Sequence, residues 1–253
     1  MVWMKIAATD FDGTFCPIGQ QVPTDNLAAV HRWQEAGHKF GIATGRGYSL
    51  ISKALAPYDL KVDYLVCNNG AVSVDDKGRM IHCQAISLDI LADLLTLPVI
   101  KSNDVPLLVF TSTHAYSVRP NPDMDMELVK RIEFQDVLRL QDVVQVSLKL
   151  ATPAEAQQVS DDIHRRLPML GGNINRSYLD INRSEANKGW GLMRMLEAGA
   201  WNGSEILAIG DDKNDLPKIE RFGGFTMTTA KPFMQEAAAK AYDSVGQMLL
   251  EHL

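Results

Sequence analysis

The sequence predicts an α/β protein whose Rossmann-like, doubly wound parallel sheet is built from both ends of the chain, with an α+β domain inserted between them. Strand-like and helix-like segments alternate up to residue 67, which is typical of a parallel sheet. Hairpins and alternating strands follow from residue 72, and a buried-strand pattern returns at residues 205–209. We place the core at residues 1–84 and 184–253 and the inserted α+β domain at residues 85–183.

The amino-acid composition indicates a globular protein and argues against nucleic-acid and membrane partners. Hydrophobic residues make up 46% of the 253 residues and charged residues 22%, which is ordinary for a globular protein. The formal net charge is −6 without a long run of like charges, so we expect no nucleic-acid partner. No apolar run is long enough to span a bilayer, so we expect no membrane partner. Three scattered cysteines favour a reducing, cytoplasmic location, and the six histidines lack the spacing of zinc ligands.

The first half of the core is expected to start with a buried strand over residues 6–9, a short apolar run that ends in charge. Thr24 or Asp25 is expected to cap the next helix, and Gly37 to end it. The same reasoning predicts three further elements, a strand over residues 40–43, a helix over residues 48–55 and a strand over residues 64–67.

The inserted domain is expected to follow a hairpin over residues 72–82. Its clearest strand covers residues 144–150, where every second side chain is apolar. The inserted domain is also expected to contain a helix over residues 153–167 and paired strands over residues 173–176 and 178–182. The second part of the core is expected to contain a helix over residues 189–198, strands over residues 205–209 and 224–227, and a final helix that reaches residue 241.

Asp10 and Asp12 follow the first predicted strand, in the segment Asp10-Phe-Asp-Gly-Thr14. Residues two apart in an extended chain point to the same side, so both carboxylates can face one site. Such a pair can hold a hard divalent cation, and one carboxylate can attack phosphorus. Gly13 permits a tight turn there. Taken alone, Asp-x-Asp favours the other interpretation, a polar Asp-Gly turn.

Three further clusters lie near the ends of predicted core strands or at a helix start. Thr44-Gly45 precedes a helix and could bind phosphate, or Thr44 could simply cap that helix. Lys188 opens a helix, where the helix dipole disfavours a cation unless an anion lies nearby. An exposed surface position is the ordinary alternative for such a lysine. The last cluster is Gly210-Asp-Asp-Lys-Asn-Asp215, whose carboxylates suit a magnesium site.

The four clusters, taken in their order along the chain, resemble the motifs of the haloacid dehalogenase (HAD) superfamily. They are Asp10-x-Asp12-Gly-Thr, Thr44-Gly45, Lys188 and Gly-Asp211-x-x-Asn-Asp. The segments Cys67-Asn-Asn-Gly-Ala, Asn187-Lys-Gly and Gly224-Phe-Thr-Met-Thr-Thr-Ala look like its Cof-type branch. That branch carries a large α/β cap between its second and third motifs. The resemblance implies a phosphoric monoester hydrolase that uses Mg²⁺ and forms an aspartyl-phosphate.

The resemblance also implies a role for each matching residue. Asp10 is the expected nucleophile, and Asp12 the expected acid and base. The expected metal ligands are the side chains of Asp10 and Asp211 and the backbone carbonyl of Asp12, and Asp215 is expected to orient a metal-bound water or Lys188. Thr44, Gly45, Lys188 and Asn214 are expected to bind the phosphate. Five residues are candidates for substrate contact: Arg46, Asn69, Arg176, Asn182 and Arg183.

The expected substrate is a small phosphorylated metabolite, with sugar phosphates first, and the expected assembly is a monomer or a homodimer. A phosphomutase of the same superfamily and a non-catalytic sugar-phosphate sensor remain as alternatives. A nucleotide-sugar transferase could use Asp-x-Asp to hold a metal, but that function would leave Lys188 and Asp211 unexplained.

Overall fold

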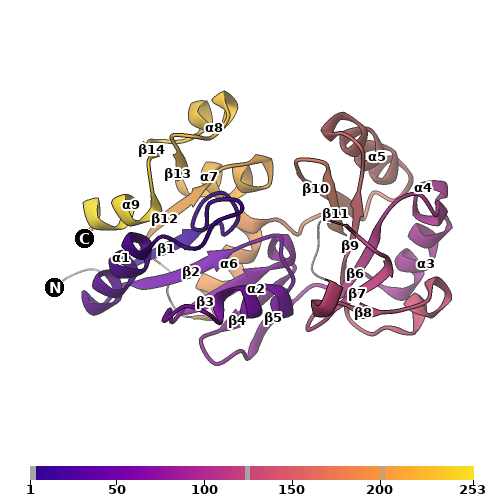
Figure 1. Ribbon diagram of the computed structural model, residues 1–253, viewed down its shortest axis with the longest axis horizontal. Helices are drawn as coiled ribbons and strands as arrows, with labels where there is room; N and C mark the ends of the chain where they lie inside the picture. Colours follow the sequence, from indigo (N-terminus) through magenta and orange to yellow (C-terminus); the bar gives the residue numbers. More distant parts are fainter. Residues whose placement is uncertain (1–3, 123–125, 200, 202) are drawn as a thin grey trace.

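Two β-sheets form the framework of the protein (Figure 1), whose computed structural model describes residues 4–122, 126–199, 201 and 203–253. The first sheet has eight strands in the order β14-β13-β12-β1-β2-β3-β4-β5, of which the first six are parallel. The last two pair in antiparallel fashion. In that order the strands are Ala241–Tyr242, Phe225–Met227, Glu205–Gly210, Lys5–Thr9, Lys39–Ala43, Tyr64–Cys67, Val72–Asp75 and Met80–Cys83.

Helices cover both faces of this sheet because its strands are apolar on both sides. Ala7 of β1 packs in one cluster with α1, α2 and α9, whereas its neighbours Ile6 and Ala8 pack with α6 on the opposite face. The sheet is therefore doubly wound, as the sequence predicted. The helices of this part are α1 (Thr24–Glu35), α2 (Tyr48–Leu55), α6 (Lys188–Ala198), α7 (Leu216–Phe222), α8 (Pro232–Ala237) and α9 (Val245–Glu251).

The second sheet is formed entirely by residues from the middle of the chain. Its order is β10-β11-β9-β6-β7-β8, antiparallel except for the pairing of β7 with β8. In that order the strands are Leu170–Asn175, Tyr178–Arg183, Val143–Lys149, Leu107–Thr111, Ala115–Arg119 and Lys130–Arg131. Three helices accompany it, α3 (Leu88–Thr96), α4 (Pro98–Lys101) and α5 (Pro153–Arg166), on the side away from the first sheet (Figure 1).

The pleat of this second sheet separates two kinds of side chain. Val146 and Leu148 of β9, with Leu179 and Ile181 of β11, belong to the cluster that packs against α3, α4 and α5. Their neighbours in sequence must point the other way, toward the first sheet. In β9 and β11 the side that faces the first sheet is consequently mainly polar, whereas Leu108 and Phe110 of β6 pack with the core cluster of the first sheet.

Three expectations about individual elements are wrong. Neither Thr24 nor Asp25 caps α1; Pro23 holds the N-cap position, and its carbonyl accepts the first amide bonds. The strand expected from residue 173 begins at Leu170, where pairing with Arg183 extends it. The last predicted helix stops at Ala237, and Ala241 instead pairs with Thr226 in β14. The last two errors share one cause, since strand pairing depends on residues distant in sequence.

Among the described residues, no helix combines the length and the apolar character that a membrane crossing requires. Cys16, Cys67 and Cys83 are all free thiols.

Candidate active site

The strand order of the first sheet brings the sequence clusters to one edge. In the parallel register Thr9 lies beside both Ile209 of β12 and Ile42 of β2. The chain segments that follow these three residues therefore leave the sheet together, and they include Asp10, Thr44 and Asp211. From β1 the strand order continues through β2 and β3 in one direction, and from β12 it continues through β13 and β14 in the opposite direction. The direction of winding therefore changes between β1 and β12, next to these residues. Ligands in open α/β sheets bind at such a point.

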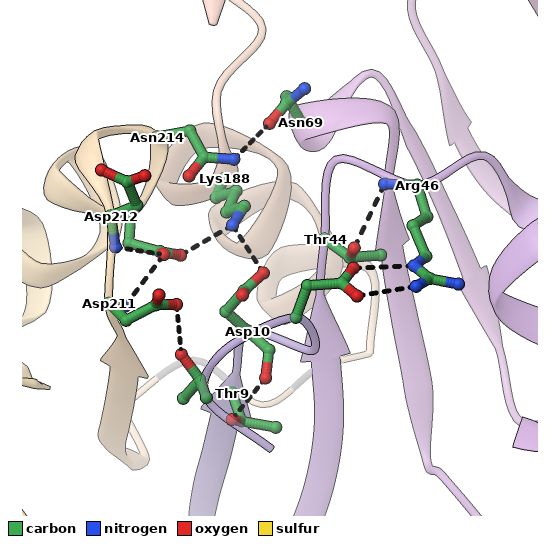
Figure 2. A network of polar contacts seen from close by, with 12 residues as sticks. Thr9, Asp10, Thr44, Arg46, Asn69, Lys188, Asp211, Asp212 and Asn214 are labelled. Carbon is green, nitrogen blue, oxygen red and sulfur yellow. Dashed lines mark hydrogen bonds and ion pairs between the residues drawn. The ribbon is translucent and has the colours of Figure 1, made fainter. Parts of the chain in front are cut away.

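Lys188 and Asp10 form a buried ion pair at this edge (Figure 2). The Lys188 ammonium donates to Asp10 Oδ1 at 2.7 Å and to Asp215 Oδ1 at 2.8 Å, and it is fully buried. Burial alone would lower the pKa of Lys188, but the two carboxylates outweigh it and raise that pKa. Asn187 caps the helix by accepting from the Trp190 amide, and this cap fixes the direction of Lys188.

Asp215 is saturated by partners from the protein. Its Oδ1 accepts from Lys188 and, at 2.7 Å, from the fully buried Lys218. Its Oδ2 accepts from the backbone amides of Asp211 and Asp212 at 3.2 and 3.4 Å. Burial raises the pKa of Asp215, but Lys188 and Lys218 outweigh that effect and lower it. Asp215 is thus a fixed anion that positions Lys188, with little capacity left for another ligand.

The turn after β1 is fitted closely to Asp211. Thr14 Oγ1 donates to Asp211 Oδ1 at 2.7 Å. Gly13 has φ +90°, and a Cβ built there would lie 2.5 Å from Asp211 Oδ2. Only glycine meets both conditions without a shift, because other residues are strained at this φ and carry the clashing atom. The turn therefore holds Asp211 close to Asp10.

The carboxylates of Asp10, Asp211 and Asp215 could hold a metal ion, since each offers an oxygen within 4.8 Å of the others. The hydrogen bonds distinguish among them. Asp215 is saturated, whereas Oδ2 of Asp10 and Oδ2 of Asp211 have no hydrogen-bond partner among the described residues. Burial raises the pKa of both Asp10 and Asp211, so their ionised forms would gain from a cation. Hard oxygen donors of this kind fit Mg²⁺.

Asp12 does not belong to this carboxylate group and instead pairs with Arg46, which Figure 2 labels. Arg46 Nε and Nη2 donate to its two oxygens at 2.7 and 2.6 Å. The Arg46 guanidinium also lies 5.1 Å from the ring centre of Phe11, and its backbone amide donates to Thr44 Oγ1 at 3.1 Å. Such a two-bond pair fixes the orientation of a carboxylate as well as its charge. Arg46 thus holds the Asp12 carboxylate in one orientation.

A cleft of about 750 Å³ opens between these residues and the second sheet. Its first-sheet wall includes Asp10, Asp12, Thr44, Gly45, Arg46 and Asn214. Its second-sheet wall includes Gln145, Ser147, Arg176 and Asp180. The volume is in the range of pockets that bind small molecules.

The structure divides the five candidates for substrate contact. Arg46 and Arg176 line the cleft. Asn69, Asn182 and Arg183 are not among its lining residues. Asn182 is fully buried and donates to the Asn68 and Val144 carbonyls at 3.2 and 2.9 Å, because the pleat of β11 turns it into the seam between the two sheets.

Asn69 and Arg183 also have partners within the protein. Asn69 is fully buried, donates to Asp180 and accepts from Asn214 at 3.0 Å. Arg183 has its nearest anionic partner in Glu185, at 3.8 Å. The hydrogen bond between Asn69 and Asn214 thus links the segment that follows β3 to the segment that follows β12 (Figure 2).

Sequence reasoning predicted Arg176 but missed Lys218 and three other residues of the second-sheet wall, Gln145, Ser147 and Asp180. The sequence of β9 could have indicated its cleft residues, because Gln145 and Ser147 interrupt the apolar run at alternate positions and so lie on one face of the strand. No comparable local signal marks Lys218, which is one lysine among many on a helix, or Asp180, which becomes notable only beside Ser147 in the sheet.

Comparison with known proteins gives consistent results. The sequence model of haloacid dehalogenase-like hydrolases matches residues 7–247. Phosphatase YwpJ of Bacillus subtilis (strain 168) is 22% identical over 93% of each chain. Pyridoxal phosphate phosphatase YbhA of Escherichia coli (strain K12) is 22% identical over 98% of each chain. The solved structure of BT4131, a HAD subclass IIB sugar phosphatase, shares the fold with a TM-score of 0.83 and 19% identity, over 98% of this chain and 99% of that one.

Proposed function

The chain belongs to the haloacid dehalogenase-like hydrolases, in their Cof-type branch, and from that premise we propose a magnesium-dependent phosphatase that uses Asp10 as its nucleophile. Its class is that of a phosphoric monoester hydrolase, as for its phosphatase relatives. The metal, the covalent intermediate and the substrate are the parts that we propose.

One observation carries the proposal. Asp10 Oδ1 is held at 2.7 Å by a fully buried ammonium, while Oδ2 has no partner among the described residues and Asp10 lines the cleft. A carboxylate that is fixed through one oxygen and free through the other is arranged for nucleophilic attack. A merely structural aspartate in so buried a position would be expected to have both oxygens satisfied.

We propose that the side chains of Asp10 and Asp211 and the backbone carbonyl of Asp12 hold Mg²⁺. When bound, the ion would supply positive charge for the carboxylates and for the phosphoryl oxygens. Lys188, the Thr44 hydroxyl and the Asn214 amide would share that task, which is most of what phosphoryl transfer requires.

In the first proposed step the Asp10 carboxylate attacks phosphorus in line, and the bond between phosphorus and the ester oxygen breaks. Asp12 gives a proton to the leaving oxygen. In the second step Asp12 takes a proton from a water molecule, which attacks phosphorus and releases Asp10. The pair with Arg46 keeps Asp12 at one position on the cleft wall, and one of its two hydrogen bonds must open for Asp12 to carry the proton that it gives and takes.

We propose that residues 85–183 act as a cap over this site. Their polar face forms one wall of the cleft and contacts the core through Asn69, Gly45 and Asn68. A cap in this position would exclude water during transfer and would select the leaving group. Relatives include phosphatases named for pyridoxal phosphate and for HMP-PP, which supports a small phosphorylated metabolite as the substrate. Within that class we propose sugar phosphates first, as the resemblance of the sequence motifs implies.

Phosphate release tests the proposal. The full chain and its Asp10→Asn variant would be assayed with a panel of phosphorylated metabolites, with and without Mg²⁺. Asp104→Asn, at an exposed position, is a matched control for loss of one carboxylate. We expect release that requires Mg²⁺, that Asp10→Asn abolishes and that the control retains.

Two other outcomes identify the alternatives. Phosphoryl transfer that occurs only after addition of a sugar bisphosphate would identify a phosphomutase. Binding of sugar phosphates without release, by folded protein that binds Mg²⁺, would identify a sensor and refute the proposed reaction.

A further inference from the structure

The wall of the cleft opposite the catalytic residues carries a carboxylate that the proposed reaction does not use. Asp180 of β11 lies directly opposite Ser147 of β9 in the antiparallel register. Both side chains, and that of Gln145 two residues earlier, point away from the apolar cluster under α3, α4 and α5. All three line the cleft. The pleat therefore places an anion in the roof of the site.

Asp180 is held next to the proposed phosphate-binding segment. Its Oδ1 accepts from Ser147 Oγ at 2.6 Å, and its Oδ2 accepts from Asn69 Nδ2 at 2.8 Å. A Cβ built on Gly45 would lie 3.2 Å from Asp180 Oδ2. Gln145 Nε2 supports the same corner by bonding Ser147 Oγ at 3.0 Å and the Gly45 carbonyl at 3.4 Å. Asp180 is thus fixed against Gly45.

The protein leaves part of this carboxylate unsatisfied. Within the described part of the chain, no lysine, arginine or histidine forms an ion pair with Asp180; its partners are one hydroxyl and one amide, and Lys188 acts on it through its charge alone. An ionised carboxylate can accept about four hydrogen bonds, so about two positions remain for a molecule in the cleft. Burial raises the pKa of Asp180 to about 6, so the group is still mainly ionised at neutral pH.

An unpaired carboxylate at this place has a chemical consequence for the substrate. Arg46 and Arg176 also line the cleft, so the repulsion is local: Asp180 disfavours a second anion placed directly beside it. A hydrogen-bond donor between Asp180 and the phosphate would remove that penalty. An arrangement that disfavours some ligands as well as favouring others is typical of specificity.

We infer that Asp180 determines substrate specificity by accepting a hydrogen bond from a hydroxyl or ammonium group on the leaving group, near the ester oxygen, and by excluding leaving groups with a second anion there. This inference rests on the proposed function, because it assigns the cleft to a phosphate ester. It goes further by naming the residue and the chemical group that it recognises.

The test compares four esters on the wild-type chain, Asp180→Ala and Asp180→Asn: a hexose 6-phosphate, phosphoethanolamine, phenyl phosphate and 2-phosphoglycolate. A hydrogen bond to a charged group is worth roughly tenfold to a hundredfold. We expect Asp180→Ala to lower kcat/KM by that factor for the donor-bearing ester that the wild type prefers. We expect little change for phenyl phosphate and a relative gain for 2-phosphoglycolate.

The Asp180→Asn variant separates the two kinds of donor. An amide oxygen still accepts from a hydroxyl but no longer attracts an ammonium, so preserved hexose 6-phosphate turnover would assign a hydroxyl. Selective loss of phosphoethanolamine turnover would assign an ammonium. An equal fall for all four esters, phenyl phosphate included, would show that Asp180 only joins the two sheets and would overturn the inference.

A binding measurement keeps this result separate from the fate of the proposed reaction. Calorimetric titration of the same esters into Asp10→Asn, with and without the added Asp180→Ala change, requires no turnover. Loss of affinity confined to donor-bearing esters supports the inference even if no phosphate is ever released. Equal affinity of both proteins for every ester overturns it.

Discussion

Replacement of Asp180 by asparagine should make the protein more stable at neutral pH. Burial raises the pKa of this carboxyl from 3.8 to about 6, so the folded protein holds the proton more tightly than the unfolded chain does. The stability that comes from the protonated form is complete below pH 3.8 and is lost as the pH rises through about 6. Asparagine is neutral at every pH, and its amide can still bond to Ser147 and Asn69.

The size of the effect follows from the shift. A rise of about two pKa units corresponds to about 3 kcal/mol at pH 7.5, which we treat as an upper value. For a chain of this length that is a gain of roughly 6–12 °C in melting temperature. At pH 4 the variant and the wild type should differ little, and the difference should open between pH 4 and pH 6.

Urea unfolding at pH 4, 5, 6 and 7.5, followed by both circular dichroism and tryptophan fluorescence, measures this difference. Asp104→Asn, at an exposed site, serves as the control for loss of one negative charge. An Asp180→Asn variant that is less stable than the wild type at pH 7.5, or whose advantage does not change with pH, would refute the reasoning. A more stable variant with altered specificity would mean that the carboxylate is kept for function at the expense of stability.

Three further predictions concern the catalytic edge. Lys188→Met leaves Asp10 buried without its cation and leaves Asp215 with Lys218 alone, so it should destabilise the fold by about 3–5 kcal/mol, measured by urea unfolding; an unchanged midpoint would contradict the ion-pair network. Gly13→Ala places a side chain at φ +90°, which costs roughly 1–3 kcal/mol of backbone strain, and its Cβ would displace Asp211. The affinity for Mg²⁺, measured by calorimetry, should therefore fall at least about tenfold. Gly19→Ala, with φ +71° and open space around it, is the control for strain alone. Mg²⁺ at 100 times its Kd should stabilise the fold by about 2.7 kcal/mol, which EDTA should reverse; a melting temperature insensitive to both would argue against a metal site.

Much of the fold was predictable because its evidence is local. The strand Tyr64–Cys67 and the helix Tyr48–Leu55 lie where the sequence predicted them, since a short apolar run and a helical period are properties of neighbouring residues. The pairing of Ala241 with Thr226 depends on a partner fifteen residues away, and the local alanine-rich pattern gave a helix instead.

By itself the sequence determined which chemistry is present and roughly where. Asp10, Thr44, Lys188 and Asp211 follow strands or open a helix, and the carboxyl ends of parallel strands must meet at one edge. Only the tertiary structure decided which of these groups are already occupied and what faces them. The Lys218 bond to Asp215, the burial of Asn182 and the place of Asp180 in the roof of the cleft each depend on partners brought together by folding. Distances of a few ångströms between residues far apart in sequence set these contacts, and no local pattern specifies such distances.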